Sequence, residues 1–102
     1  MIHVIAAVEL APGKRDEYLE LFAQFIPKVL AENGCIAYGP TIDIDSGFGA
    51  QEPLRDNVVT VVEQWSDLDA LTAHIQAPHM AEYKEAVKDI VVGLKLQILQ
   101  PV

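Results

Sequence analysis

Hydrophobic residues in the first third of the chain change from strand spacing to helix spacing. From Ile2 to Leu10 the chain is rich in Ile, Val and Ala on both alternating faces, which predicts a strand covered on both sides. Pro12-Gly13 ends this strand. Apolar residues then recur every three or four positions between Lys14 and Glu32, which predicts a helix with one buried face. Pro27 lies within this stripe, so we expect a kink there, and Asn33-Gly34 is a typical helix stop.

The middle of the chain predicts two strands separated by a polar segment. Cys35 to Asp45 predicts the second strand, and Val58 to Trp65 predicts a third that alternates between two faces. The segment between them, Ser46 to Asp56, contains glycines and a proline and is long for a hairpin turn. We therefore expect either an extended loop or an arm that contacts a second subunit.

The last third predicts a helix in two pieces followed by a strand. Ser66, with Asp69 three residues later, is expected to begin the helix by capping its first free amides. Apolar residues continue at helical spacing as far as Val91, but Pro78 interrupts them, which predicts an elbow at Ala77-Pro78. Gly93 is expected to end the helix, and Leu94 to Gln100 alternates as the last strand.

The order β-α-β-β-α-β predicts an α+β fold of the ferredoxin-like type, with a four-stranded antiparallel sheet and the helices on one face. With 102 residues and no break in composition, we expect a single domain over residues 1–102. The other face of the sheet would carry too many Val, Ile and Leu side chains to remain in water. We therefore expect two sheets to pair face to face in a homodimer.

Composition and charge argue against several classes of partner. The chain has 7 basic and 15 acidic residues and a formal charge of −8, which disfavours nucleic acids and anionic membrane surfaces. No apolar run approaches the roughly 20 residues of a membrane helix, and no secretory signal is recognisable, so we expect a cytoplasmic protein. Cys35 is the single cysteine and is expected to be a small buried hydrophobe.

Candidate chemistry gathers near the end of the third predicted strand and the elbow after it. The familiar P-loop, HExxH and GxSxG motifs are absent, and the group consists of Trp65, His74, His79, Met80 and Tyr83. Helical spacing places His79 and Tyr83 on one face and turns His74 toward the core. Singly, an inward histidine is often a satisfied core residue, and a tryptophan is often a core anchor. Together they could clamp a flat aromatic ring and move one proton, because a histidine with a pKa of about 6.5 is a suitable base near pH 7.

No metal site is expected from the spacing of possible ligands. His3, His74 and His79 are the only histidines, and a five-residue spacing across a proline is not the usual helical ligand pair. Glu63 and Asp43 lie on predicted strands, but no ordered spacing links them to the histidines.

Several short motifs occur in a fixed order along nearly the whole chain. They are Pro12-Gly13-Lys14, Glu32-Asn33-Gly34-Cys35, Glu63-Gln64-Trp65, Ala73-His74-Ile75, Pro78-His79-Met80 and Ile98-Leu99-Gln100-Pro101. This ordered set resembles the antibiotic biosynthesis monooxygenase (ABM) family, most closely its branch of bacterial quinol monooxygenases. In that branch Gly34-Cys35, Tyr38, Pro40 and the Pro-His-Met segment have counterparts.

The resemblance implies a homodimeric α/β barrel with a pocket between sheet and helices. It implies a monooxygenase that uses no cofactor or metal and oxidises a quinol or similar dihydroxyaromatic with dioxygen. The implied base is His74 or His79, and the implied substrate contacts are Trp65, Tyr83, Met80 and Tyr38.

Other activities are compatible with the same fold. The alternatives are an isomerase or tautomerase of a small carbonyl compound and a non-catalytic module that binds an aromatic or haem. Two branches fit poorly. The polyketide-ring oxygenases have a polar amide where this chain has Val61, and the haem-degrading branch has one where this chain has Ile5-Ala6-Ala7.

Overall fold

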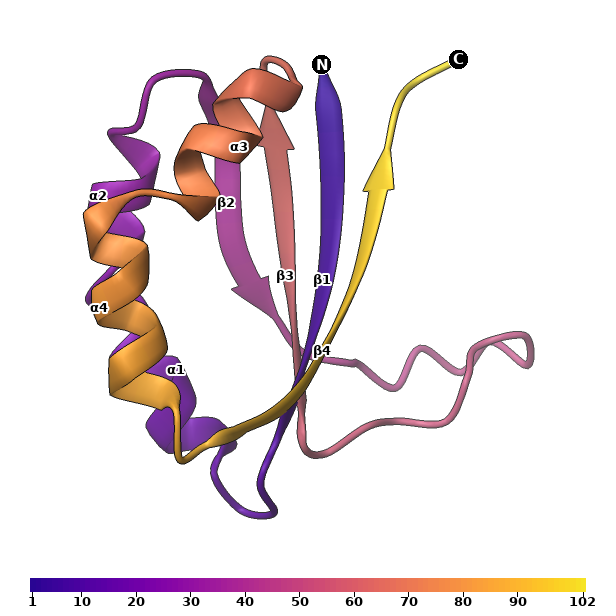
Figure 1. Ribbon diagram of the computed structural model, residues 1–102. Coiled ribbons are helices and arrows are strands. Elements are labelled where there is room, and N and C mark those ends of the chain that lie inside the picture. The colour runs from indigo at the N-terminus through magenta and orange to yellow at the C-terminus, as the bar shows by residue number, and fades with distance from the viewer.

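The computed structural model describes residues 1–102 and contains one four-stranded antiparallel sheet (Figure 1). The strands are β1 (Ile2–Leu10), β2 (Cys35–Thr41), β3 (Val58–Trp65) and β4 (Val91–Leu99), in the spatial order β2-β3-β1-β4. β1 pairs with both β3 and β4, and β2 pairs with the outer side of β3. The ferredoxin-like topology predicted from the sequence is confirmed.

Four short helices lie on one side of the sheet (Figure 1). They are α1 (Arg15–Ala23), α2 (Ile26–Leu30), α3 (Leu68–Ile75) and α4 (Pro78–Val87). The first predicted helix is interrupted at Gln24 and Phe25, so the kink expected at Pro27 is a break just before it. The second is interrupted at Ala77, whose backbone is extended (φ −65°, ψ 143°) because a proline disfavours helical geometry in the residue before it. The predicted elbow at Ala77-Pro78 is confirmed.

The predicted end of the second strand is wrong. β2 ends at Thr41 and does not reach Asp45. Thr41 pairs with Thr60, and β3 begins only two residues before that partner, at Val58. Little of β3 therefore remains for residues beyond Thr41 to pair with, although the apolar alternation continues through Ile42 and Ile44.

The boundaries around α3, α4 and β4 also differ from those predicted. Asp67, not Ser66, caps α3, because its carboxylate accepts a hydrogen bond of 2.8 Å from the backbone N–H of Ala70. α4 ends at Val87, and Gly93 lies within β4, opposite Glu9. The last strand therefore begins at Val91 and not at Leu94.

The hydrophobic core lies between the sheet and the helices. The alternation predicted for Val58 to Trp65 is confirmed, because every second residue of β3 is at most 6% exposed: Val59, Val61, Glu63 and Trp65. Tyr18 and Phe22 of α1 are buried against this layer, and Val4, Ala6 and Val8 of β1 complete it. Two polar side chains, Glu63 and His74, are buried with them.

The other face of the sheet carries no helix (Figure 1). The register places Ile5 opposite Val62 and Ala7 opposite Thr60 on this face, and Val62 is 40% exposed. The open face expected from the sequence is present, but it is mixed and not strongly apolar, because Gln64, Lys95 and Gln97 share it with these residues.

Residues 42–57 form an extended loop that projects away from the sheet (Figure 1). It exposes Ile44 and Phe48, and it is held by an ion pair in which Arg55 Nη2 lies 2.8 Å from Asp43 Oδ1. The hydrogen bonds from Arg55 lower the pKa of Asp43 to about 2. None of the helices is long and apolar enough to cross a membrane.

Candidate active site

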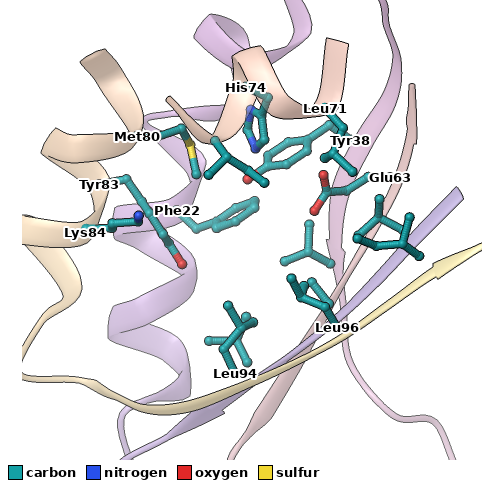
Figure 2. A pocket seen from close by; sticks show the side chains of 16 residues that line it. Phe22, Tyr38, Glu63, Leu71, His74, Met80, Tyr83, Lys84, Leu94 and Leu96 are labelled. Carbon is teal, nitrogen blue, oxygen red and sulfur yellow. The ribbon is translucent and has the colours of Figure 1, made fainter. Parts of the chain in front are cut away.

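A cavity of about 200 Å³ lies between the sheet and the helices (Figure 2). Its lining is apolar or aromatic except for Glu63, His74 and Lys84. Side chains from α1, α3 and α4 face it from one side and side chains from all four strands from the other. The cavity is open beside β4, where Leu94, Leu96 and Ile98 are 46–57% exposed.

The elbow between α3 and α4 places both candidate histidines against one carboxylate. His74 is in the last turn of α3, and His79 is in the first turn of α4. His74 Nδ1 and His79 Nε2 lie 2.7 and 2.9 Å from the same atom, Glu32 Oε2. A carboxylate can only accept hydrogen bonds, so both of these ring nitrogens carry a proton and donate it.

A tight backbone approach brings Glu32 to this position. The backbone N–H of Ser66 donates to the carbonyl of Gly34 at 2.8 Å, which docks the connection between α2 and β2 against the start of α3. Gly34 has a φ of +85°, and a Cβ atom there would lie 2.6 Å from the Ala70 side chain. Only glycine meets both demands, so Gly34 fixes the distance between Glu32 and α3.

The proton on Nδ1 of His74 determines what the ring presents to the cavity. With Nδ1 donating to Glu32, a neutral imidazole has its lone pair on Nε2. No protein group hydrogen-bonds to His74 Nε2, and no fully buried side-chain nitrogen or oxygen lacks a partner, so this atom is open to the cavity that His74 lines. The arrangement matches the carboxylate and histidine of a catalytic triad, in which the carboxylate orients the base.

Glu63 is a second carboxyl group at the cavity wall. It is 6% exposed, and its Oε1 accepts a hydrogen bond of 2.9 Å from the indole N–H of Trp65. Burial raises the pKa of Glu63, although the Trp65 hydrogen bond and the nearby His74 act in the opposite direction. In Figure 2 the Glu63 carboxylate points into the hollow that His74 also borders.

Aromatic side chains hold these groups in place. The Trp65 and His74 rings lie 4.6 Å apart between centroids, and the Tyr38 ring meets His74 edge-on at 5.5 Å. Phe22 stacks on Tyr38 at 5.4 Å. The Tyr83 hydroxyl hydrogen-bonds to that of Tyr18 at 2.5 Å, and burial raises the pKa of each of these two phenols.

The structure brings some of the predicted site residues to the cavity and places others behind it. Tyr38, His74, Met80 and Tyr83 line the cavity. Trp65 is fully buried and contacts His74 and Glu63 from behind, and His79 reaches the site through Glu32.

The sequence reasoning missed Glu32 and gave Glu63 no role. Glu32 is 42 residues from His74, and its only signal is its place in the Glu32-Asn33-Gly34-Cys35 motif. Glu63 is signalled by a carboxylate on the buried face of a strand, where charge is unusual.

The ligand atoms of Glu32, His74 and His79 all lie within 4.8 Å of one another, close enough to hold a metal ion. The expectation of no metal site was based only on the spacing of the histidines along the chain. In the structure, Glu32 from a distant segment joins His74 and His79.

Residues 1–86 match the antibiotic biosynthesis monooxygenase family. The chain belongs to this family. ABM membership assigns the chain to the monooxygenases and agrees with the resemblance seen in the sequence. The chain is also 42% identical to the Escherichia coli K12 protein named "Probable quinol monooxygenase YgiN", over 99% of this chain and 98% of that protein.

Solved structures share the ABM fold. A conserved protein from Methanosarcina mazei Go1 has a TM-score of 0.80 and 25% identity, and the match covers 97% of this chain and 90% of that one. PA3566 from Pseudomonas aeruginosa has a TM-score of 0.79 and 21% identity, with 99% and 93% covered. These likenesses extend over nearly the full length of each chain.

Proposed function

We propose that this ABM protein oxidises a quinol or a similar dihydroxyaromatic with dioxygen and without a cofactor. The observation that carries the proposal is the unpartnered Nε2 of His74, which borders a mostly apolar cavity and is oriented by Glu32. The name of the E. coli relative supports the same substrate class.

The size of the cavity suits one aromatic ring. A protein cavity of about 150 Å³ is known to bind benzene, so about 200 Å³ has room for a ring with hydroxyl substituents. Phe22, Met80 and Tyr83 would contact the faces and edges of the ring. Lys84 and the open side along β4 would form the entrance.

The proposed reaction begins with proton transfer to His74 Nε2. Removal of one hydroxyl proton gives a quinolate that is electron-rich enough to reduce dioxygen, and a dry, shaped cavity keeps the partners together. One oxygen atom forms a bond to a ring carbon and the other leaves as water. The sum is quinol plus dioxygen to hydroxyquinone plus water, so the substrate supplies all the electrons.

The second hydroxyl of the substrate would meet Glu63 or Tyr38. Glu63 Oε2 and the Tyr38 hydroxyl have no hydrogen-bond partner in the protein, and both residues line the cavity. Because the pKa of Glu63 is raised by burial, its carboxyl group retains a proton to a higher pH than an ordinary glutamate and can donate a hydrogen bond.

The remaining predicted site residues take supporting roles in this proposal. Trp65 packs on the His74 ring and holds Glu63, so it is a positioning residue. His79 acts through Glu32 and is also a positioning residue. We further propose a cytoplasmic homodimer that pairs through the open face of the sheet, because Ile5, Ala7 and Val62 lie there uncovered by any helix.

The test is oxygen uptake with a panel of hydroquinones in the presence of a metal chelator. His74→Ala is expected to lower the rate by about 10²- to 10⁴-fold, the range for loss of a general base. His79→Ala is expected to lower it less, because Glu32 still accepts the proton of His74 Nδ1. His3→Ala removes the remaining histidine, which the register places opposite Gln64 on the open face, and serves as the matched control once gel filtration shows that its oligomeric state is unchanged. Unchanged uptake in His74→Ala would exclude His74 as the base.

A further inference from the structure

Glu32, His74 and His79 form a ligand set that the proposed reaction uses only for positioning. Two imidazoles and one carboxylate, contributed by three separate segments, are typical of sites for zinc and other divalent transition metals. Most such sites need only one further ligand, which is often water.

The cluster is shielded and carries a charge that favours a cation. The side chains of His74, Glu32 and His79 are 5%, 13% and 18% exposed. No lysine or arginine pairs with Glu32, whose only ionic partners are the two imidazoles. The formal charge of the chain is −8, and Glu63 is close enough for Glu32 to raise its pKa.

We propose that Glu32, His74 and His79 bind a divalent transition-metal cation of the zinc class, and that the bound ion switches off His74 as a base. The binding half of this proposal stands on the ligand geometry alone. The inhibitory half rests on the proposed function.

The three ligand atoms are already gathered and would have to adjust to tetrahedral spacing. Ligand atoms that lie about 2.0–2.1 Å from a tetrahedral zinc ion are about 3.3 Å from one another. In the structure Glu32 Oε2 is 2.7 Å from His74 Nδ1 and 2.9 Å from His79 Nε2. The carboxylate oxygen would have to move about half an ångström away from the two nitrogens, and the nitrogens, which lie within 4.8 Å of each other, would have to close to about 3.3 Å. Side-chain rotation would make this adjustment, and the ion would replace the two shared protons.

Metal binding would exchange the roles of the two ring nitrogens of His74. A metal on Nδ1 needs the lone pair of that atom, so a neutral ring must carry its proton on Nε2. Nε2 is the atom that borders the cavity, and with a proton it can donate but cannot accept. The metal would thus convert the base into a hydrogen-bond donor without entering the substrate cavity.

The binding test uses tag-free protein that has been stripped with chelator and titrated with Zn²⁺ by calorimetry. Wild-type protein is expected to bind one ion per chain, and Co²⁺ is expected to give a visible absorption band of low-coordinate cobalt. Glu32→Gln and His79→Asn should each weaken binding by at least about tenfold. Glu82→Gln is the matched control, because Glu82 is exposed and pairs with Lys28 outside the cluster. Circular dichroism verifies that each variant is folded.

The tautomer test uses nitrogen-15 NMR of the histidine side chains. The His74 proton is expected on Nδ1 without metal and on Nε2 with one equivalent of Zn²⁺. Absence of binding to the wild type, or equal weakening in Glu82→Gln and Glu32→Gln, overturns the proposed site. If Zn²⁺ binds and the proton stays on Nδ1, His74 is not a ligand, and both the three-residue site and the inhibitory half are wrong.

Oxygen uptake separates this inference from the proposed function. Wild-type uptake with a hydroquinone is expected to fall in Zn²⁺ and to recover on chelation, whereas Glu82→Gln should behave as the wild type. Uptake that is unaffected by bound Zn²⁺ overturns the switch but leaves the monooxygenase proposal standing. Binding of Zn²⁺ to a protein that consumes no oxygen with any quinol supports the site and contradicts the proposed function.

Discussion

Glu32 and Glu63 are two carboxylates close to His74, and the protein surrounds them in opposite ways. Glu32 comes from a connecting segment and accepts hydrogen bonds from two imidazoles. Glu63 comes from the middle of β3, faces an apolar cavity and accepts one hydrogen bond from an indole. The two imidazole N–H groups fix Glu32 as a hydrogen-bond acceptor. The apolar surroundings of Glu63 raise the pKa of that carboxyl group and favour its protonated form. One fold can therefore give an orienting group and a proton-holding group to the same histidine.

Removal of Glu32 is expected to have the largest effect of the changes that test this comparison. Glu32→Ala leaves two imidazole N–H groups without their acceptor in a mostly buried place, so the free energy of unfolding should fall by about 2–3 kcal/mol. Urea unfolding at a fixed protein concentration measures this loss in the free energy of unfolding. Glu32→Gln keeps an acceptor oxygen and should lose less. Equal losses in the two variants would show that the hydrogen bonds do not hold this region.

Substitution of Glu63 is expected to change how stability depends on pH. The folded-state pKa of Glu63 is raised, so the folded protein binds more protons than the unfolded chain from pH 4.5 upward. Stability from this group is present below pH 4.5 and is lost as the pH rises through the folded-state value. Glu63→Gln should therefore become more stable relative to the wild type as the pH rises, in unfolding experiments with chelator present. A constant difference between the two proteins across pH 4–8 would contradict the raised pKa.

The partly buried carboxylate Asp43, which pairs with the half-exposed Arg55, provides the smallest expected effect. Its pKa is lowered to about 2 by hydrogen bonds from Arg55, so its contribution is present above pH 3.8 and is lost as the pH falls through about 2. Asp43→Asn should change the free energy of unfolding at pH 7 by less than about 1 kcal/mol, because its partner Arg55 is 48% exposed and ion pairs at the surface contribute little. Thermal unfolding of this variant beside Glu32→Ala measures the contrast. A loss as large as that of Glu32→Ala would mean that the loop carries more of the stability than its exposure indicates.

The sequence predicted the elements of the fold because each has its own periodicity. The strand alternation of Val58 to Trp65 and the proline elbow before Pro78 depend on neighbouring residues, and both are confirmed. The end of β2 could not be predicted from Ile42 and Ile44, because strand pairing depends on where β3 begins. Alternation shows that a segment can form a strand, and a partner decides whether it does.

The candidate site was only partly predictable for the same reason. Helical spacing turned His74 inward, and it is 4% exposed in the structure. The partner of His74 is 42 residues away, and no local pattern connects it with Glu32. The contact depends on Gly34, whose positive φ and close approach to α3 become visible only when the chain is folded.

The cavity draws one of its walls from Leu94, Leu96 and Ile98 on β4, an edge strand beyond the residues 1–86 that match the family. The proton-handling groups all lie within the matched part. Substitutions at these three positions would therefore widen or narrow the cavity without touching the histidines or carboxylates. The last strand is thus a place where the size of the accepted molecule can be changed separately from the proton chemistry.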